Sequence, residues 1–88
     1  MADSVSNAIL REKFQRQERL GEVTAAEVAG RCGWESKEKS GRKKPDSSRV
    51  NRTLGIVAEA GEFRTEVTED SAILLCRALH VDPWEVGL

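Results

Sequence analysis

A run of apolar residues at helical spacing, in "EDSAILLCRALHV" near the C-terminal end, constrains the fold of this chain more than any other feature. Four of its residues follow the i, i+3, i+4, i+7 spacing of one helix face: Ala72, Leu75, Cys76 and Leu79. Thr68 can cap this helix, and Ile73 and Leu74 widen its apolar face. We therefore expect a helix over residues 68–81 that is largely buried and needs other elements packed around it.

Composition limits those other elements to a single small domain. The chain has 88 residues, of which 39% are hydrophobic and 33% charged, as in a soluble globular protein with one modest core. No apolar run approaches the ~20 residues that cross a bilayer. The first residues, "MADSVSNAILREK", lack the charged and then apolar pattern of a secretion signal. We expect one domain over residues 1–88 in an intracellular, cytoplasmic protein.

Caps, apolar spacing and closing glycines predict four further helices, over residues 7–21, 24–33, 46–54 and 83–88. Their expected N-caps are Ser6 or Asn7, Thr24, Asp46 and Asp82. Glu27 completes a capping box at the second of these helices, and Gly33 supplies a left-handed turn residue at its end. Trp84 and Leu88 are expected to close the core. The prediction is an all-α fold, a compact bundle of about five short helices.

Two segments fall outside these helices. Residues 35–45 carry no large apolar side chain and are predicted to form a long basic loop. Residues 56–67 alternate apolar and polar side chains on both sides of Ala60-Gly61, which predicts an arm or a small β-hairpin.

The net charge of −1 conceals opposite charges in the two halves of the chain. Between Arg11 and Arg52 there are 12 Lys and Arg residues against 7 acids, and from Thr53 to Leu88 there are 2 against 7. Such asymmetry predicts one face for a polyanion and another face turned away from it, although a charged run is often only solvated surface.

The basic half contains the candidate binding residues. In helix 46–54 only Val50 and Leu54 are large and apolar, so the opposite face offers hydroxyl, amide and guanidinium groups, which bind base edges and phosphates. The preceding loop adds five cations that can lie along the phosphate backbone or enter the minor groove, becoming ordered on binding. The candidate DNA-binding residues are Lys37, Lys39, Arg42, Lys43, Lys44, Ser47, Ser48, Arg49, Asn51 and Arg52. The alternative is an ordinary polar surface helix beside a solvated linker.

The sequence offers no catalytic or metal-binding group of residues. Cys32 and Cys76 are far apart and His80 is the one histidine, so the four ligands of a zinc site cannot be assembled. Both cysteines lie at apolar helix positions, where we expect small buried hydrophobes, with a disulfide as the less favoured alternative. Without a nucleophile–base pair or a phosphate-binding glycine loop, we expect no enzyme, no cofactor and no small-molecule ligand.

Two segments, one from each of two successive predicted helices, resemble a helix-turn-helix. "TAAEVAGRCGW" resembles its first half, with Ala29 and Gly33 in the positions of the buried alanine and the turn glycine. "SSRVNRTLG" resembles the recognition helix, with Val50 as its buried anchor. The resemblance implies that this second helix enters the major groove of DNA.

The resemblance extends to the end of the chain. "VNRTLG" is similar to the "VSRxL" run of bacterial repressors. "AILLCRALHVDPWEVGL" is similar to the closing helices of lambda-repressor-like (Cro-type) domains, which commonly read "LARALGVDPxEL". From Thr24 to Leu88 the chain therefore resembles that family and, in order and spacing, its small immunity repressors from phages of actinobacterial hosts.

The chain departs from the family pattern in the turn. Gly33 and Val50 are 17 positions apart. In the family they are about six apart, because the turn itself is short, so the chain has an insertion of about eleven residues. The insertion puts the tight turn and the fixed angle between the two helices in doubt, although a longer loop costs little closure entropy.

The resemblance implies a sequence-specific regulator that binds double-stranded DNA. We expect a transcriptional repressor of phage or bacterial origin, associated with the nucleoid, and the resemblance allows a homodimer on the DNA. Helix 46–54 would read the major groove, and loop 35–45 would hold the backbone. The alternative is a protein-interaction module, an antitoxin or adaptor on the same helical fold, which salt-insensitive binding of a protein without duplex affinity would favour.

Overall fold

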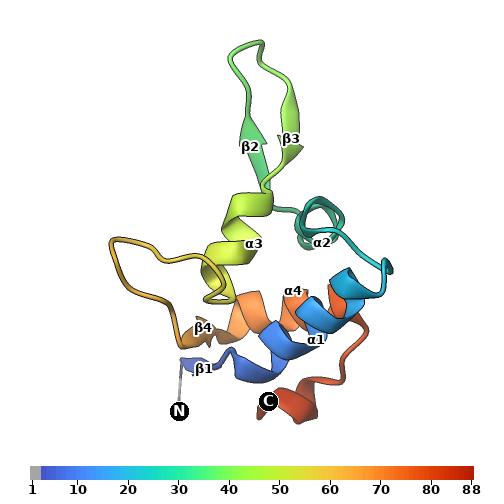
Figure 1. The fold of residues 1–88 in the computed structure, drawn as a ribbon, viewed down its shortest axis with the longest axis vertical. Helices are drawn as coiled ribbons and strands as arrows, with labels where there is room; N and C mark the ends of the chain where they lie inside the picture. Colours follow the sequence, from blue (N-terminus) through green and yellow to red (C-terminus); the bar gives the residue numbers. More distant parts are fainter. Residues whose placement is uncertain (1–2) are drawn as a thin grey trace.

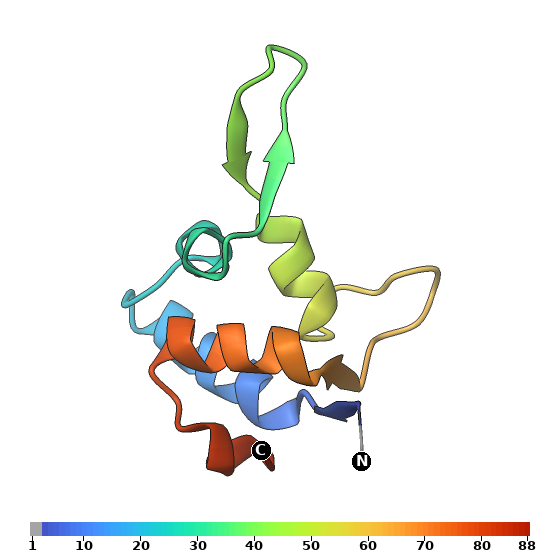
Figure 2. The same cartoon turned by 180° about the vertical axis from the view of Figure 1, so that it is seen from behind.

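The structure, a computed structural model, describes residues 3–88. Within them the chain forms, in order, β1 (Ser4–Ser6), α1 (Ala8–Arg19), α2 (Ala25–Cys32), β2 (Glu35–Lys37), β3 (Lys43–Pro45), α3 (Ser47–Thr53), β4 (Glu66–Thr68), α4 (Glu69–Leu79) and the 3-10 helix η1 (Pro83–Val86). The strands make two small antiparallel sheets, one joining β1 to β4 and the other joining β2 to β3 (Figures 1 and 2). The fold is therefore a small α+β fold, and the expected all-α bundle is wrong.

The β1–β4 sheet ties the beginning of the chain to the start of α4. Val5 pairs with Val67 at its centre; Val67 is buried, and Val5 packs partly against the core. Each strand has three residues, too few for the apolar alternation that identifies a strand in a sequence. The pairing therefore depends on a partner some sixty positions away along the chain.

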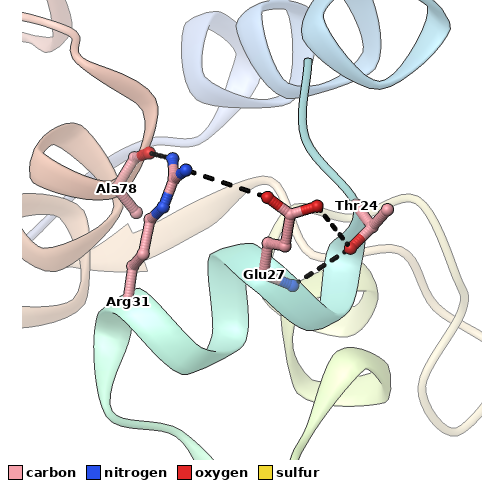
Figure 3. Close-up of polar contacts among 4 residues, drawn as sticks. All are labelled: Thr24, Glu27, Arg31 and Ala78. Atoms are coloured by element: carbon pink, nitrogen blue, oxygen red, sulfur yellow. Dashed lines mark hydrogen bonds and ion pairs between the residues drawn. The ribbon is translucent and has the colours of Figure 1, made fainter. Parts of the chain in front are cut away.

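The predicted helix caps are largely confirmed. Thr24, Asp46 and Thr68 each accept a hydrogen bond from the backbone N–H three residues further on, at 3.1, 3.2 and 3.3 Å. The capping box at Thr24 differs from the prediction. In a capping box the Glu27 carboxylate would accept a hydrogen bond from the backbone N–H of Thr24, whereas here it accepts one from the Thr24 hydroxyl, at 3.5 Å (Figure 3). No helix among residues 3–88 is long and apolar enough to cross a membrane.

The core lies where the four α-helices meet, and the predicted stripe of α4 is buried in it. Its completely buried large side chains include Leu10, Phe14, Val28, Val50, Leu54 and Leu75. Trp84 does not close this core, since it is 72% exposed, and Val86 points inward instead. Residues two apart in a 3-10 helix lie on different faces, so η1 buries only one of these two. Trp34, only 4% exposed, is the tryptophan in the core.

The last carbonyl groups of α4 are bound by side chains from two other helices. Arg31 of α2 donates from Nη1 to the carbonyl oxygen of Ala78 at 2.9 Å, and Nη2 lies 3.8 Å from Glu27 (Figure 3). Gln17 of α1 donates to the carbonyl oxygen of Leu79 at 2.8 Å. These bonds satisfy carbonyl groups that a helix end leaves without partners. Arg31 therefore stabilises the fold, although it belongs to the basic half of the sequence.

Asn7, a predicted N-cap, makes no side-chain cap and is completely buried. Its Nδ2 donates to the carbonyl oxygens of Thr53 and Arg64 at 3.1 and 2.9 Å, and its Oδ1 accepts from Arg11 at 3.1 Å. One amide side chain thus joins α1, the end of α3 and the segment that follows α3. Leaving such a group without partners costs more than the bond itself contributes, so this contact fixes the three segments together.

Candidate nucleic-acid interface

The insertion between α2 and α3 begins and ends at neighbouring points. A hydrogen bond of 2.9 Å from the N–H of Asp46 to the carbonyl oxygen of Trp34 closes its base. Apart from the insertion, only Gly33, Trp34 and Asp46 lie between the two helices. A connection of three residues is typical of a helix-turn-helix. In Figure 1 α2 is seen end-on while α3 lies in the plane of the picture, so the helices cross steeply. The insertion therefore leaves the tight turn in place.

The insertion is a β-hairpin and not the expected loop. At its tip the N–H of Glu38 donates to the carbonyl oxygen of Arg42 at 2.8 Å, and the N–H of Gly41 donates to that of Glu38 at 2.9 Å. Gly41 has φ +83°, which makes this a three-residue hairpin loop with a left-handed glycine. Ser40-Gly41 is the one local signal that indicates the turn. The strands themselves consist of residues with little preference for β-structure.

The hairpin holds all five predicted cations at the surface: Lys37, Lys39, Arg42, Lys43 and Lys44. Lys37 and Lys43 are directly opposite each other in the β2–β3 ladder and so share one face. Like charges in this position destabilise an antiparallel pair. On the other face, Lys44 Nζ lies 3.8 Å from the Glu38 carboxylate. An anion bound between Lys37 and Lys43 would relieve their repulsion.

The predicted face of α3 is available only in part. Ser48 and Arg49 are exposed, whereas Ser47, Asn51 and Arg52 are half-buried, and Val50 is the buried anchor. One amide hydrogen of Asn51 is used within the helix, because Nδ2 donates to the carbonyl oxygen of Ser47 at 3.2 Å. Ser48 and Arg49 are therefore the most accessible groups of this helix.

Arg49 is held over a tryptophan ring. Its guanidinium carbon lies 4.4 Å from the centroid of the Trp34 ring, within the range of a cation–π contact. A stacked guanidinium keeps the N–H donors in its plane free to bind an anion or a base. The role of Trp34 was missed in the sequence, where it was only the last residue of the segment that resembles the first half of a helix-turn-helix. The contact orients Arg49 beside the base of the hairpin.

Arg52, at the other end of α3, faces an acidic residue from the following segment. Arg52 Nε lies 3.9 Å from Glu59 Oε2, and Arg64 Nη2 lies 2.8 Å from the same oxygen. Together with Arg49 they line a polar cleft of about 490 Å³ that reaches the start of α4. Arg64 is a candidate site residue that the sequence did not indicate, because it belongs to the acidic half of the chain and to no periodic pattern.

The candidate residues therefore form two groups on α3. The hairpin extends from the N-terminal end of α3, and the segment from Ile56 to Thr65, called the arm below, leaves its C-terminal end (Figures 1 and 2). In Figure 1 α1 lies in the half of the molecule away from the hairpin tip, and its C-terminal end leads directly to α2. Of the two predicted alternatives for residues 56–67, the structure has the arm and not the hairpin, since within it a single isolated β-bridge joins Glu59 to Glu62 and the last two residues belong to β4.

The two cysteines are buried free thiols, as predicted. Burial raises the pKa of the Cys32 thiol to about 11, an effect that the nearby Arg49 only partly opposes. Burial also raises the pKa of Cys76, and the carboxylates of Glu85 and Asp82 add to the effect. Both side chains are thus neutral at pH 7 and behave as small hydrophobes. Within the described part of the chain, no three His, Cys, Asp or Glu side chains gather where they could hold a metal ion.

Comparisons of this chain with protein-family models, with curated proteins and with solved structures found no match. The function proposed below therefore rests on the geometry of α3, the hairpin and the arm, together with the residues that resemble Cro-type domains.

Proposed function

We propose that this chain is a sequence-specific regulator that binds double-stranded DNA, with α3 in the major groove and the hairpin on the adjacent phosphate backbone. The observation that carries the proposal is the closed base of the hairpin, where Asp46 binds Trp34 and fixes five cations at the N-terminal end of a polar helix. Recognition helices place their N-terminal residues against base edges. The resemblance to Cro-type domains adds that the regulator acts as a repressor in the cytoplasm.

The dimensions of the hairpin suit this arrangement. Residues 35–45 place about five residues on each side, and at ~3.3 Å per residue the hairpin reaches ~17 Å from its base. The major groove is ~12 Å wide, so the tip of a hairpin that starts beside a helix in the groove passes the groove edge and meets phosphates. A phosphate between Lys37 and Lys43 would also replace a repulsion with two attractions.

The exposed and half-buried polar groups of α3 supply the means to read bases. Arginine binds the O6 and N7 acceptors of guanine with two hydrogen bonds, and asparagine does the same at the N6 and N7 atoms of adenine. Arg49, oriented by Trp34, and Arg52 are the candidates for guanine. Asn51 is the candidate for adenine.

A protein-interaction module is less well supported. Its surface would be expected to gather exposed apolar side chains, and single exposed hydrophobic residues are normal on any protein. The most exposed ones here are Leu20 after α1, Phe63 in the arm and Trp84 in η1. They lie on three separate elements of the chain.

Arg52→Ala is expected to weaken binding to a preferred duplex by about 1–3 kcal/mol, because a lost bidentate contact removes that much discrimination. Preference should relax at one base position and remain at the others. The preferred duplex can be selected from a random pool with the wild-type chain. Fluorescence anisotropy then gives the dissociation constants of each protein for the preferred duplex and for a random duplex.

Arg19→Ala is the matched control, since it removes one exposed arginine at the end of α1. Arg19→Ala should change the affinities for the preferred and the random duplex only slightly, because its charge acts on the DNA only at long range. Equal losses for Arg52→Ala on preferred and random duplexes would show that Arg52 contacts phosphate and does not read a base.

A further inference from the structure

The Glu59 carboxylate lies where an anion would bind. One of its oxygens is 2.8 Å from Arg64 Nη2 and 3.9 Å from Arg52 Nε, at the edge of the polar cleft. Arg49, Arg52 and Arg64 bring three positive charges to this cleft, and Glu59 and Glu66 bring two negative ones. A phosphate of DNA that pairs with Arg52 or Arg64 would therefore compete with the Glu59 carboxylate for that arginine.

The arm that carries Glu59 is anchored at both ends. At its start, the N–H groups of Ile56 and Val57 both donate to the carbonyl oxygen of Asn51 in α3, at 2.9 and 3.2 Å. At its end, the buried Asn7 binds the carbonyl oxygen of Arg64, and the backbone N–H of Asn7 binds the next carbonyl at 3.0 Å. The position of Glu59 is therefore set by backbone contacts with α3 and α1.

The turn that follows Glu59 contains an unusual conformation. Glu59 and Glu62 exchange two backbone hydrogen bonds, of 2.8 and 3.1 Å, around Ala60-Gly61. Ala60 has φ +54°, a left-handed conformation that an L-residue adopts only at a cost. Such strain is retained where the surrounding structure requires it, and functional sites are common among these places. Here it returns the chain so that Arg64 reaches the Glu59 carboxylate.

We propose that Glu59 lowers the affinity of the chain for DNA, because it occupies Arg52 and Arg64 as an internal substitute for phosphate. This inference rests on the proposed DNA-binding function. An exposed ion pair changes an equilibrium constant by about 1.4- to 5-fold. A bidentate contact between arginine and the correct base changes it by about 5- to 150-fold. The correct base therefore draws Arg52 away from Glu59 and bears the whole cost of breaking that ion pair, whereas a random phosphate competes on nearly equal terms and bears only part of the cost.

The test is Glu59→Gln, with Glu62→Gln as the matched control. Both variants remove one negative charge from the same turn, and Glu62 takes part in no ion pair in the described portion of the protein. Anisotropy titrations on the preferred duplex should show Glu59→Gln binding about two- to fivefold more tightly than wild type. On a random duplex the gain should be no larger, so the ratio of preferred to random affinity does not fall. Glu62→Gln should leave both affinities nearly unchanged.

A double variant separates this effect from a general change in charge. In the Arg52→Ala background, Glu59→Gln frees only Arg64, so its gain on random DNA should be smaller than in the wild-type background. A Glu59→Gln protein that behaves like Glu62→Gln, or that binds random DNA more weakly than wild type, would overturn the role of Glu59 and leave DNA binding intact. A wild-type chain without affinity for any duplex would remove both proposals.

Discussion

Gly55→Ala is expected to destabilise the fold by about 2–5 kcal/mol, a large share of the ~5–15 kcal/mol that stabilises a small domain. Gly55 has φ +74°, and an L-residue pays ~1–2 kcal/mol in this conformation. A Cβ atom would also collide with the carbonyl oxygen of Arg64 and lie 3.2 Å from the Arg11 guanidinium. That carbonyl cannot easily move, because Asn7 holds it, and overpacking of this kind costs another ~1–3 kcal/mol. Urea unfolding followed by circular dichroism measures the loss.

Gly61→Ala is the matched control for this substitution. Gly61 has a similar φ of +82°, but no atom lies within 4 Å of the position that a Cβ would take. Only the conformational cost of ~1–2 kcal/mol is therefore expected. If Gly55→Ala and Gly61→Ala lowered the free energy of unfolding equally, the end of α3 could not lie as close to the arm as the structure has it.

Replacing Arg42, Lys43 and Lys44 together with alanine is expected to weaken duplex binding about a hundredfold near 0.1 M salt. Each phosphate contact contributes about −0.9 to the slope of log K against log salt, so the slope should flatten by up to ~2–3 units. Affinity should fall equally on preferred and random duplexes, because phosphates carry no sequence information. Stability should change little, since all three side chains are exposed.

The control for the hairpin variant removes Arg16 and Arg19, two exposed arginines in the last turn of α1, outside the hairpin and α3. Charges that touch no phosphate act only within a Debye length of ~10 Å, so the slope should change by well under one unit. An equally small change in the slope for the hairpin variant would exclude the hairpin from the binding site. If the hairpin variant lost only its preference for the selected duplex, the hairpin would read sequence, through arginine in a narrow minor groove.

The helices of this fold could be predicted because their signals are local. Thr24, Asp46 and Thr68 cap helices within three residues of themselves, and the apolar stripe of α4 repeats over several turns. The β1–β4 sheet could not be predicted, since its three-residue strands are defined only by their pairing. Trp84 was misplaced because a 3-10 helix changes which of its residues points inward.

The candidate site was predicted where it consists of consecutive residues. The five hairpin cations and the polar face of α3 follow from charge and helical spacing, although the hairpin itself was taken for a loop. The ring of Trp34 beneath Arg49 and the Glu59 carboxylate between Arg52 and Arg64 result from tertiary packing. The hydrogen bond between Asp46 and Trp34 that closes the hairpin could not be predicted either, because no local pattern shows that two positions twelve residues apart are neighbours.

A nuclear magnetic resonance titration tests the central claim most directly, namely that this chain binds duplex DNA through α3 and the hairpin. The amide signals of the ¹⁵N-labelled chain are followed while a preferred duplex is added at about 50 mM salt, where phosphate contacts are strong. We expect the largest shifts at residues 37–44 and at Ser48, Arg49 and Arg52, and none at η1. No shift at any duplex concentration, or shifts centred on Leu20 and Trp84, would contradict the claim.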